Sequence, residues 1–201
     1  MKSIYRFLIK PKKDRYNNTI ELNGKELIIN SRIETFESVS KDAIVEIVPQ
    51  AFKTNIKPGS EIIVHHNVFR RFYDMKGKEK NSASFFKEDL FFCDIEQIYL
   101  YKDNDQWVTN LNYCFVKPLR NDDKMSLEKE KPLMGIIKYN NDKAVSNDVK
   151  IGDLITFTPN SEFEFIIDGE RLYCMKLNDI AIKHERKGNE KEYNPSWAHC
   201  S

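Results

Sequence analysis

The sequence has few of the features from which enzyme active sites are commonly built. It contains only seven glycines in 201 residues, which leaves little backbone permissive enough for a glycine-rich phosphate loop. It also lacks the Gly-x-Ser-x-Gly and His-Glu-x-x-His motifs of serine hydrolases and zinc proteases. We therefore expect a protein that is not an enzyme and that needs no cofactor.

The chain also lacks an excess of charge and a long apolar run. Its 32 Lys and Arg residues nearly balance 31 Asp and Glu residues, for a formal net charge of +1, which gives no electrostatic argument for nucleic acid or an anionic membrane. No segment approaches the roughly 18 apolar residues of a membrane span, and the N-terminus has no signal-peptide core. A cytoplasmic protein that binds another protein or a small ligand is expected.

Metal and disulfide chemistry have little support. No Cys-x-x-Cys spacing occurs, and three of the four cysteines lie inside apolar strand patterns, which favours reduced packing residues; the four are Cys93, Cys114, Cys174 and Cys200. His65 and His66 are adjacent. On a strand, neighbouring side chains point to opposite faces, so the pair is not expected to bind one metal ion.

What the sequence does contain is an internal repeat. A strand pattern that ends in proline occurs at Tyr5–Pro11 and again at Asn112–Pro118. Three further blocks recur in the same order: 43–48 with 134–139, 56–64 with 149–157, and 90–98 with 172–180. Four matched blocks in one order indicate a duplication.

Each copy of the repeat has about five short strand patterns separated by turn signals, which predicts a closed all-β barrel or a sandwich. We expect a first domain at 1–102, a second at 107–184, and a frayed polar C-terminal tail at 185–201. The polar stretch Lys102–Gln106 is expected to link the domains. The first copy also carries an insertion at 70–88, which is expected to be a solvated loop.

The second copy carries the most specific pattern of the chain. Val149-Lys150-Ile151-Gly152-Asp153 leads into the strand pattern 154–157, Asp168-Gly169 is a strong hairpin signal, and Asn178-Asp179-Ile180 closes the unit. This order of elements resembles the C-terminal half of the ten-kilodalton, GroES-like co-chaperonins, which are the lids of the chaperonin cage. The resemblance implies two tandem GroES-like irregular antiparallel β-barrels in a homo-oligomer that caps a chaperonin ring and assists ATP-dependent folding without chemistry of its own.

The resemblance also implies a docking site. In the family, a mobile loop between the first and second strands carries a short aliphatic run that binds the chaperonin. The corresponding segment here is Lys12–Lys41, and its aliphatic triplet is Leu27-Ile28-Ile29. Asn23-Gly24 in the same segment is also the signal for an ordinary two-residue hairpin, so the triplet is either a docking site or part of a structural hairpin, or both. The second copy has only the charged segment Arg120–Lys131 there.

A second function remains open from the sequence. The duplicated β-barrel could be a structural or assembly module, for example in a viral particle, that keeps the fold without docking on a chaperonin. The two functions differ in the role that they give to Lys12–Lys41.

Overall fold

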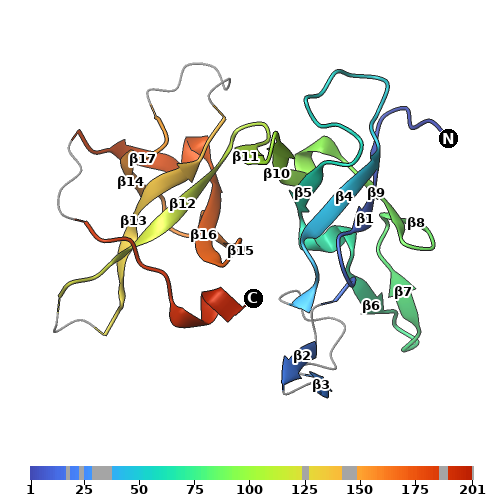
Figure 1. The fold of residues 1–201 in the computed structure, drawn as a ribbon, viewed down its shortest axis with the longest axis horizontal. Helices are drawn as coiled ribbons and strands as arrows, with labels where there is room; N and C mark the ends of the chain where they lie inside the picture. The colour runs from blue at the N-terminus through green and yellow to red at the C-terminus, as the bar shows by residue number, and fades with distance from the viewer. Residues whose placement is uncertain are drawn as a thin grey trace. The chain divides into compact units, whose positions relative to one another are not determined.

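The computed structural model describes residues 1–16, 19–22, 25–28, 38–123, 127–141, 149–185 and 190–200, with the backbone alone over 19–22, 25–28 and 199–200. The chain divides into two compact units, Met1–Trp107 and Val108–Ser201 (Figure 1). The regular elements of the described residues are β-strands and short 3-10 helices. The predicted all-β class is therefore confirmed. Among these residues, no helix is long and apolar enough to cross a membrane.

The first unit is built on a seven-stranded sheet. Its strands are β1 (Phe7–Pro11), β4 (Asp42–Ile47), β5 (Glu61–Val64), β8 (Phe85–Lys87), β9 (Leu90–Cys93), β10 (Ile98–Asp103) and β11 (Gln106–Thr109). They lie in the order β11-β10-β5-β4-β1-β9-β8. Two hairpins form separate two-stranded sheets, β2 (Thr19–Leu22) with β3 (Lys25–Ile28), and β6 (Arg71–Tyr73) with β7 (Glu79–Asn81).

The second unit is built on a six-stranded sheet with the same topology. Its strands are β12 (Tyr113–Arg120), β13 (Glu130–Tyr139), β14 (Leu154–Phe157), β15 (Phe163–Ile167), β16 (Glu170–Lys176) and β17 (Ile180–Lys183). Their order, β15-β16-β12-β13-β14-β17, matches β8-β9-β1-β4-β5-β10 of the first unit strand for strand. A 3-10 helix also precedes the last matched strand in each unit, η3 (Ile95–Gln97) and η4 (Leu177–Asp179). Such a match is what a duplication produces.

The turn before β5 and the turn before β14 have one geometry. Gly59 and Gly152 have φ values of 86° and 90°, a left-handed conformation that glycine adopts without a steric penalty. Each glycine N–H donates across the sheet, to the Val45 carbonyl at 2.7 Å and to the Ile137 carbonyl at 2.8 Å. The Lys-x-Gly pattern therefore places a tight turn at the same point of both sheets.

Strand register refines the alignment of the two copies. Pro11 pairs with Ala43 and Pro118 pairs with Gly135, so Ala43 corresponds to Gly135. The sequence comparison matched Ala43 with Met134, one residue earlier, because both blocks are apolar and a one-residue slip barely changes such a pattern. Hydrogen-bond pairing between strands decided the register.

The pairing of the strands leaves each sheet open. Over the residues that the structure describes, β8 and β11 form the two edges of the first sheet, and β15 and β17 form those of the second. The sequence pattern predicted closed barrels or sandwiches, and hydrogen-bonded closure is not found. Short antiparallel strands with turn signals are common to barrels and open sheets, so the pattern could not separate the two.

Each unit has its own apolar core. Val64 and Cys93 are fully buried in the first unit, and Phe157 and Cys174 are at most 3% exposed in the second, as the duplication predicted. Cys93, Cys114 and Cys174 are free thiols. Burial raises the pKa of all three, to about 12 for Cys114. They are therefore protonated, unreactive packing residues.

The segment predicted to link the domains is a hairpin turn. Asn104 and Asp105 both have positive φ values, 49° and 60°, and they join β10 to β11 in a two-residue turn of the type that favours Asn and Asp. The division between the compact units falls at Trp107, inside β11. The linker prediction rested on polarity, which tight turns and linkers share.

The insertion at 70–88 is also more ordered than predicted. It contains the β6–β7 hairpin and then β8, which pairs with β9, and not an irregular loop, although most of its residues are exposed to solvent as predicted. Since β8 corresponds to β15 in the second unit, only the β6–β7 hairpin has no counterpart there.

The C-terminal segment, predicted as a frayed tail, is held against the second unit over 190–198. Tyr193 N–H donates to the Pro118 carbonyl at 2.9 Å, so the segment pairs with the C-terminal end of β12. The Asn194 side chain accepts from the Arg171 N–H and donates to the Gly169 carbonyl. Ala198, in the 3-10 helix η5 (Ser196–Cys200), is fully buried. The fraying prediction was wrong because charged composition does not show such long-range contacts.

Candidate functional site

The segment Lys12–Lys41 begins and ends in a paired stem, which consists of residues 12–16 and 39–42. Beyond β1 and β4 the two chains stay paired, because Lys12 N–H donates to the Asp42 carbonyl at 3.0 Å and Ser40 N–H donates to the Arg15 carbonyl at 3.1 Å. A further antiparallel bridge joins Tyr16 to Val39, and both side chains are buried. The part of the segment beyond this bridge therefore departs from a fixed base.

Within the segment, β2 and β3 pair as a hairpin, from Thr19 with Ile28 to Leu22 with Lys25. This is the strand pairing that the Asn23-Gly24 signal predicts. Leu27 and Ile28 lie in β3, and their side chains are outside the described part of the structure, as is all of Ile29. A docking role for Leu27, Ile28 and Ile29 thus stays a prediction.

Arg15 is the main anchor of the stem. Its guanidinium donates to the Phe69 carbonyl, to the Arg70 carbonyl at 3.1 Å and to Asn81 Oδ1 at 2.6 Å. Its Cζ also lies 4.9 Å from the ring centre of the buried Phe91. One side chain therefore fixes the stem to both ends of the β6–β7 hairpin.

A second contact between the same two elements comes from Tyr16. Its hydroxyl oxygen accepts from the Arg71 N–H at 2.6 Å, and the Arg71 guanidinium lies 4.9 Å from the Tyr16 ring centre. Burial lowers the pKa of Arg15, and the charge of Arg71 lowers it further. Removing two neighbouring cations even partly from water is costly unless they are hydrogen-bonded, so the contacts of Arg15 are expected to matter for the stability of the stem.

Little in the sequence indicates that Arg15 is an anchor. Arg15 follows Lys12, Lys13 and Asp14, a charged run that is typical of solvent-exposed chain. Its partners lie more than 50 positions away, and only the fold brings them to it.

Lys12, at the start of the stem, belongs to an ion network with Glu61 and Lys102. Glu61 Oε2 accepts from Lys12 Nζ at 2.8 Å and is 3.0 Å from Lys102 Nζ. These hydrogen bonds, Lys12 first, lower the pKa of Glu61. The residue in the corresponding position of β14 is Leu154, so the second unit cannot form the same network.

The histidine pair does not alternate across a strand as predicted. His65 precedes the 3-10 helix η2 (His66–Val68), and its Nδ1 accepts from the Asn67 N–H. The two imidazole rings stack, with centres 4.3 Å apart. Burial, then the charge of His65, lowers the pKa of His66 to about 4, so this ring is neutral at pH 7. In the described part of the chain, no group of three or more His, Cys, Asp or Glu residues could hold a metal ion.

The second unit has a different polar cluster near the corresponding connection. There β12 and β13 stay paired to Arg120 with Glu130, and Asn121 N–H donates to the Lys129 carbonyl at 2.8 Å. Arg171 binds Glu130, and it donates to Glu164 at 2.7 Å and to the Tyr173 hydroxyl at 2.7 Å.

The electrostatic effects on this cluster oppose one another. Burial lowers the pKa of Arg171, but its hydrogen bond to Glu164 and the nearby acidic groups raise it overall. Burial also raises the pKa of Tyr173, and the hydrogen bond that Tyr173 donates to Glu130 raises it further. A cluster whose polar groups are hydrogen-bonded to one another typically has a structural role. We therefore expect the docking site to belong to the first unit.

Comparison with known proteins does not identify the chain. No protein-family model matches it. No curated protein matches it either.

Proposed function

We propose that this protein is a tandem co-chaperonin-like lid that caps a chaperonin ring and assists ATP-dependent folding, with no chemistry of its own. The observation that carries the proposal is the place of the β2–β3 hairpin. It lies between β1 and β4, which are neighbours in the sheet, and it follows a rigid stem. The co-chaperonin resemblance places a docking loop in the same interval.

The proposal includes a GroES-like barrel for each unit. The common strand order and the common Lys-x-Gly turn support it. So does the burial of three consecutive residues of β12, Cys114, Phe115 and Val116. Because successive side chains point to opposite faces, the sheet is covered on both faces there, as expected where a sheet bends around its own core.

The central experiment is Ile28→Asp in the full chain. If Ile28 is buried against the ring, the change replaces apolar burial worth roughly 1.5–3 kcal/mol with the desolvation of a carboxylate. In a ring of several copies every protomer would suffer this loss, and avidity would enlarge it. We expect the variant to lose co-migration with a nucleotide-loaded chaperonin ring in size-exclusion chromatography, while its melting temperature stays near that of the wild type.

Ile151→Asp is the matched control, because Ile151 is 56% exposed in a turn of the second unit. It should co-migrate as the wild type does. Undiminished co-migration of Ile28→Asp would contradict the docking role of the triplet. A large drop in its melting temperature would instead assign Ile28 to a packed structural hairpin.

The second candidate, a duplicated assembly module, is supported by the edge of β17. In the first unit the equivalent strand, β10, is covered by β11. No described strand covers the outer edge of β17, where Ala181 is exposed and Ile182 is 53% exposed. An uncovered edge can pair with a strand of another chain. We propose a second copy of this protein as the partner, because β11 already pairs with β10, the strand of the first unit that is equivalent to β17.

We test this edge with Ala181→Pro. Ala181 is the extra residue of a β-bulge, because Ile180 pairs with Phe157 and Ile182 pairs with Thr156. Proline is tolerated at bulges and on edge strands, where it hinders pairing with another chain. Proline there should block pairing between copies and leave the unit folded, and light scattering should show a smaller assembly. Ala83→Pro, at an exposed turn position, is the control. An unchanged assembly size in Ala181→Pro would exclude pairing through this edge.

A further inference from the structure

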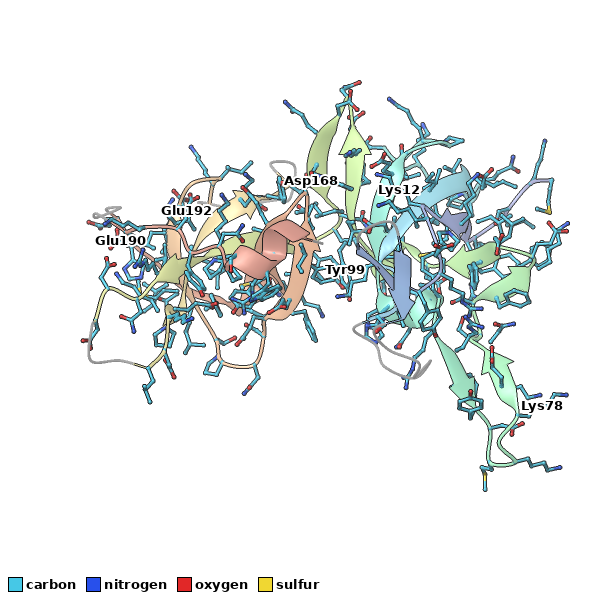
Figure 2. All side chains as sticks on the ribbon, turned by 60° about the horizontal axis from the view of Figure 1, so that its bottom comes forward. Lys12, Lys78, Tyr99, Asp168, Glu190 and Glu192 are labelled. Carbon is cyan, nitrogen blue, oxygen red and sulfur yellow. The ribbon has the colours of Figure 1, made fainter. Side chains whose placement is uncertain are left out.

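The β6–β7 hairpin presents apolar side chains on a fixed backbone. Met75 is fully exposed at its tip, and Phe72 and Tyr73 in β6 are 41% and 50% exposed. Figure 2, in which Lys78 is labelled near the tip, shows the hairpin projecting from the rest of the first unit. An exposed apolar side chain at the end of a projecting hairpin can bind another protein.

The tip of the hairpin is held in one conformation. The Asp74 carboxylate oxygen Oδ1 accepts from both the Lys76 and the Lys78 N–H groups at 2.9 Å. Asp74 N–H donates to the Lys78 carbonyl, and Gly77 has the positive φ of 71° that the turn requires. Met75 is therefore displayed by a turn whose geometry does not depend on the Met75 side chain, so binding there would order little additional chain.

The charge around Met75 indicates the chemistry of a partner. Lys76 and Lys78 flank the tip, are exposed, and form no ion pair with any residue that the structure describes. Asp74 and Glu79 are engaged, by Lys80 at 4.0 Å and by Arg71 at 2.9 Å. The outer surface of the tip is thus apolar and basic, which complements an apolar surface with acidic residues at its rim.

The base of the β6–β7 hairpin is joined to the stem, and this connection indicates which partner the tip would bind. Arg15 donates to the Arg70 carbonyl and to Asn81, and Tyr16 accepts from the Arg71 N–H. Both residues belong to the stem that carries the proposed docking segment. The described residues of the second unit contain no counterpart of the β6–β7 hairpin. A partner that approaches the docking segment would therefore meet the β6–β7 hairpin at the same end of the first unit.

We propose that the tip of the β6–β7 hairpin, centred on Met75 with Lys76 and Lys78, is a second docking surface for the chaperonin ring, which it contacts at an apolar patch rimmed by acidic residues. This inference rests on the proposed function. It adds a contact to the ring that is independent of Leu27, Ile28 and Ile29.

The experiment compares Met75→Asp, Lys78→Glu and wild type for affinity to a nucleotide-loaded chaperonin ring at low and moderate salt. We expect Met75→Asp to weaken binding at least about tenfold, as central apolar contacts do. Lys78→Glu should weaken binding mainly at low salt, because exposed charges are screened at higher ionic strength. Lys53→Glu is the control, since Lys53 is exposed elsewhere on the first unit. Melting temperatures should stay unchanged, as the turn depends on Asp74.

The outcomes separate this inference from the proposed function. If wild type binds, Ile28→Asp does not, and both tip variants bind as wild type, the proposed function stands and the second docking surface is excluded. If wild type does not bind the ring, the proposed function itself fails. If the tip variants alter self-association in light scattering but leave ring binding unchanged, the hairpin contacts a second copy and the inference is overturned.

Discussion

Gly135→Ala is expected to unfold the second unit at a clearly lower temperature while the first unit melts as before. A Cβ added at Gly135 would lie 2.3 Å from Val116 Cγ1 and 2.6 Å from the Lys117 carbonyl oxygen. The valine methyl can rotate away, but the carbonyl belongs to the paired strand β12 and cannot move without breaking its ladder. Overpacking of this kind costs about 1–3 kcal/mol, and each kcal/mol lowers the melting temperature of a domain of this size by roughly 4–8 °C.

The first unit supplies the control for this change. Ala43 occupies the corresponding position, pairs with Pro11, and is fully buried with its Cβ in place. Ala43→Gly should cost the first unit about 0.5–1 kcal/mol, since it removes a small contact and adds backbone freedom. At this position we thus expect alanine to be the more stable residue in the first unit and glycine in the second. A Gly135→Ala variant as stable as wild type would show that β12 and β13 can separate at this point.

Leu172→Ala should destabilise the second unit by about 2–5 kcal/mol. Leu172 is fully buried in β16, where it pairs with Phe165 of β15. The shorter alanine side chain leaves a cavity. β16 cannot move to fill it, because it is paired with β15 on one side and with β12 on the other. We expect the second unit to unfold before the first, because each unit buries its own core.

The two tryptophans make this prediction measurable. Trp107 ends the first compact unit, and Trp197 lies in η5 of the second, with its ring centre 5.8 Å from the Arg171 guanidinium. In a Trp107→Phe background, tryptophan fluorescence reports the second unit, and in a Trp197→Phe background it reports the first. Leu127→Ala, at a fully exposed leucine, should leave the transition unchanged. If both units lose stability together, the chain unfolds as one cooperative body and the duplication does not divide it energetically.

Local sequence patterns were enough for several parts of the fold. The Asp168-Gly169 signal predicted the turn between β15 and β16, and both residues have positive φ values. Alternating apolar residues predicted the strands, and four blocks in a common order predicted two copies, whose strand orders match. These features depend on neighbouring residues, whose preferences act whatever the rest of the chain does.

Features that depend on contacts between distant residues were missed or mistaken. The anchoring of Arg15 to Asn81 and the docking of Asn194 on Gly169 occur in polar stretches, and the turn that joins β10 to β11 is polar as well. A polar stretch has the same composition whether it is a tail, a linker, a loop or an edge strand. The one-residue shift of Ala43 onto Gly135 was missed because runs of similar apolar residues allow either register.

For the candidate site, the sequence by itself determined the interval of the chain, Lys12–Lys41, its hairpin signal and its aliphatic triplet. The tertiary structure decided that this interval begins and ends on a fixed stem, and that Arg15 and Tyr16 join the stem to the β6–β7 hairpin. The physical reason is that a hairpin turn is specified by the backbone preferences of two residues, whereas the partly buried Arg15 is held by carbonyl groups that only folding brings to it.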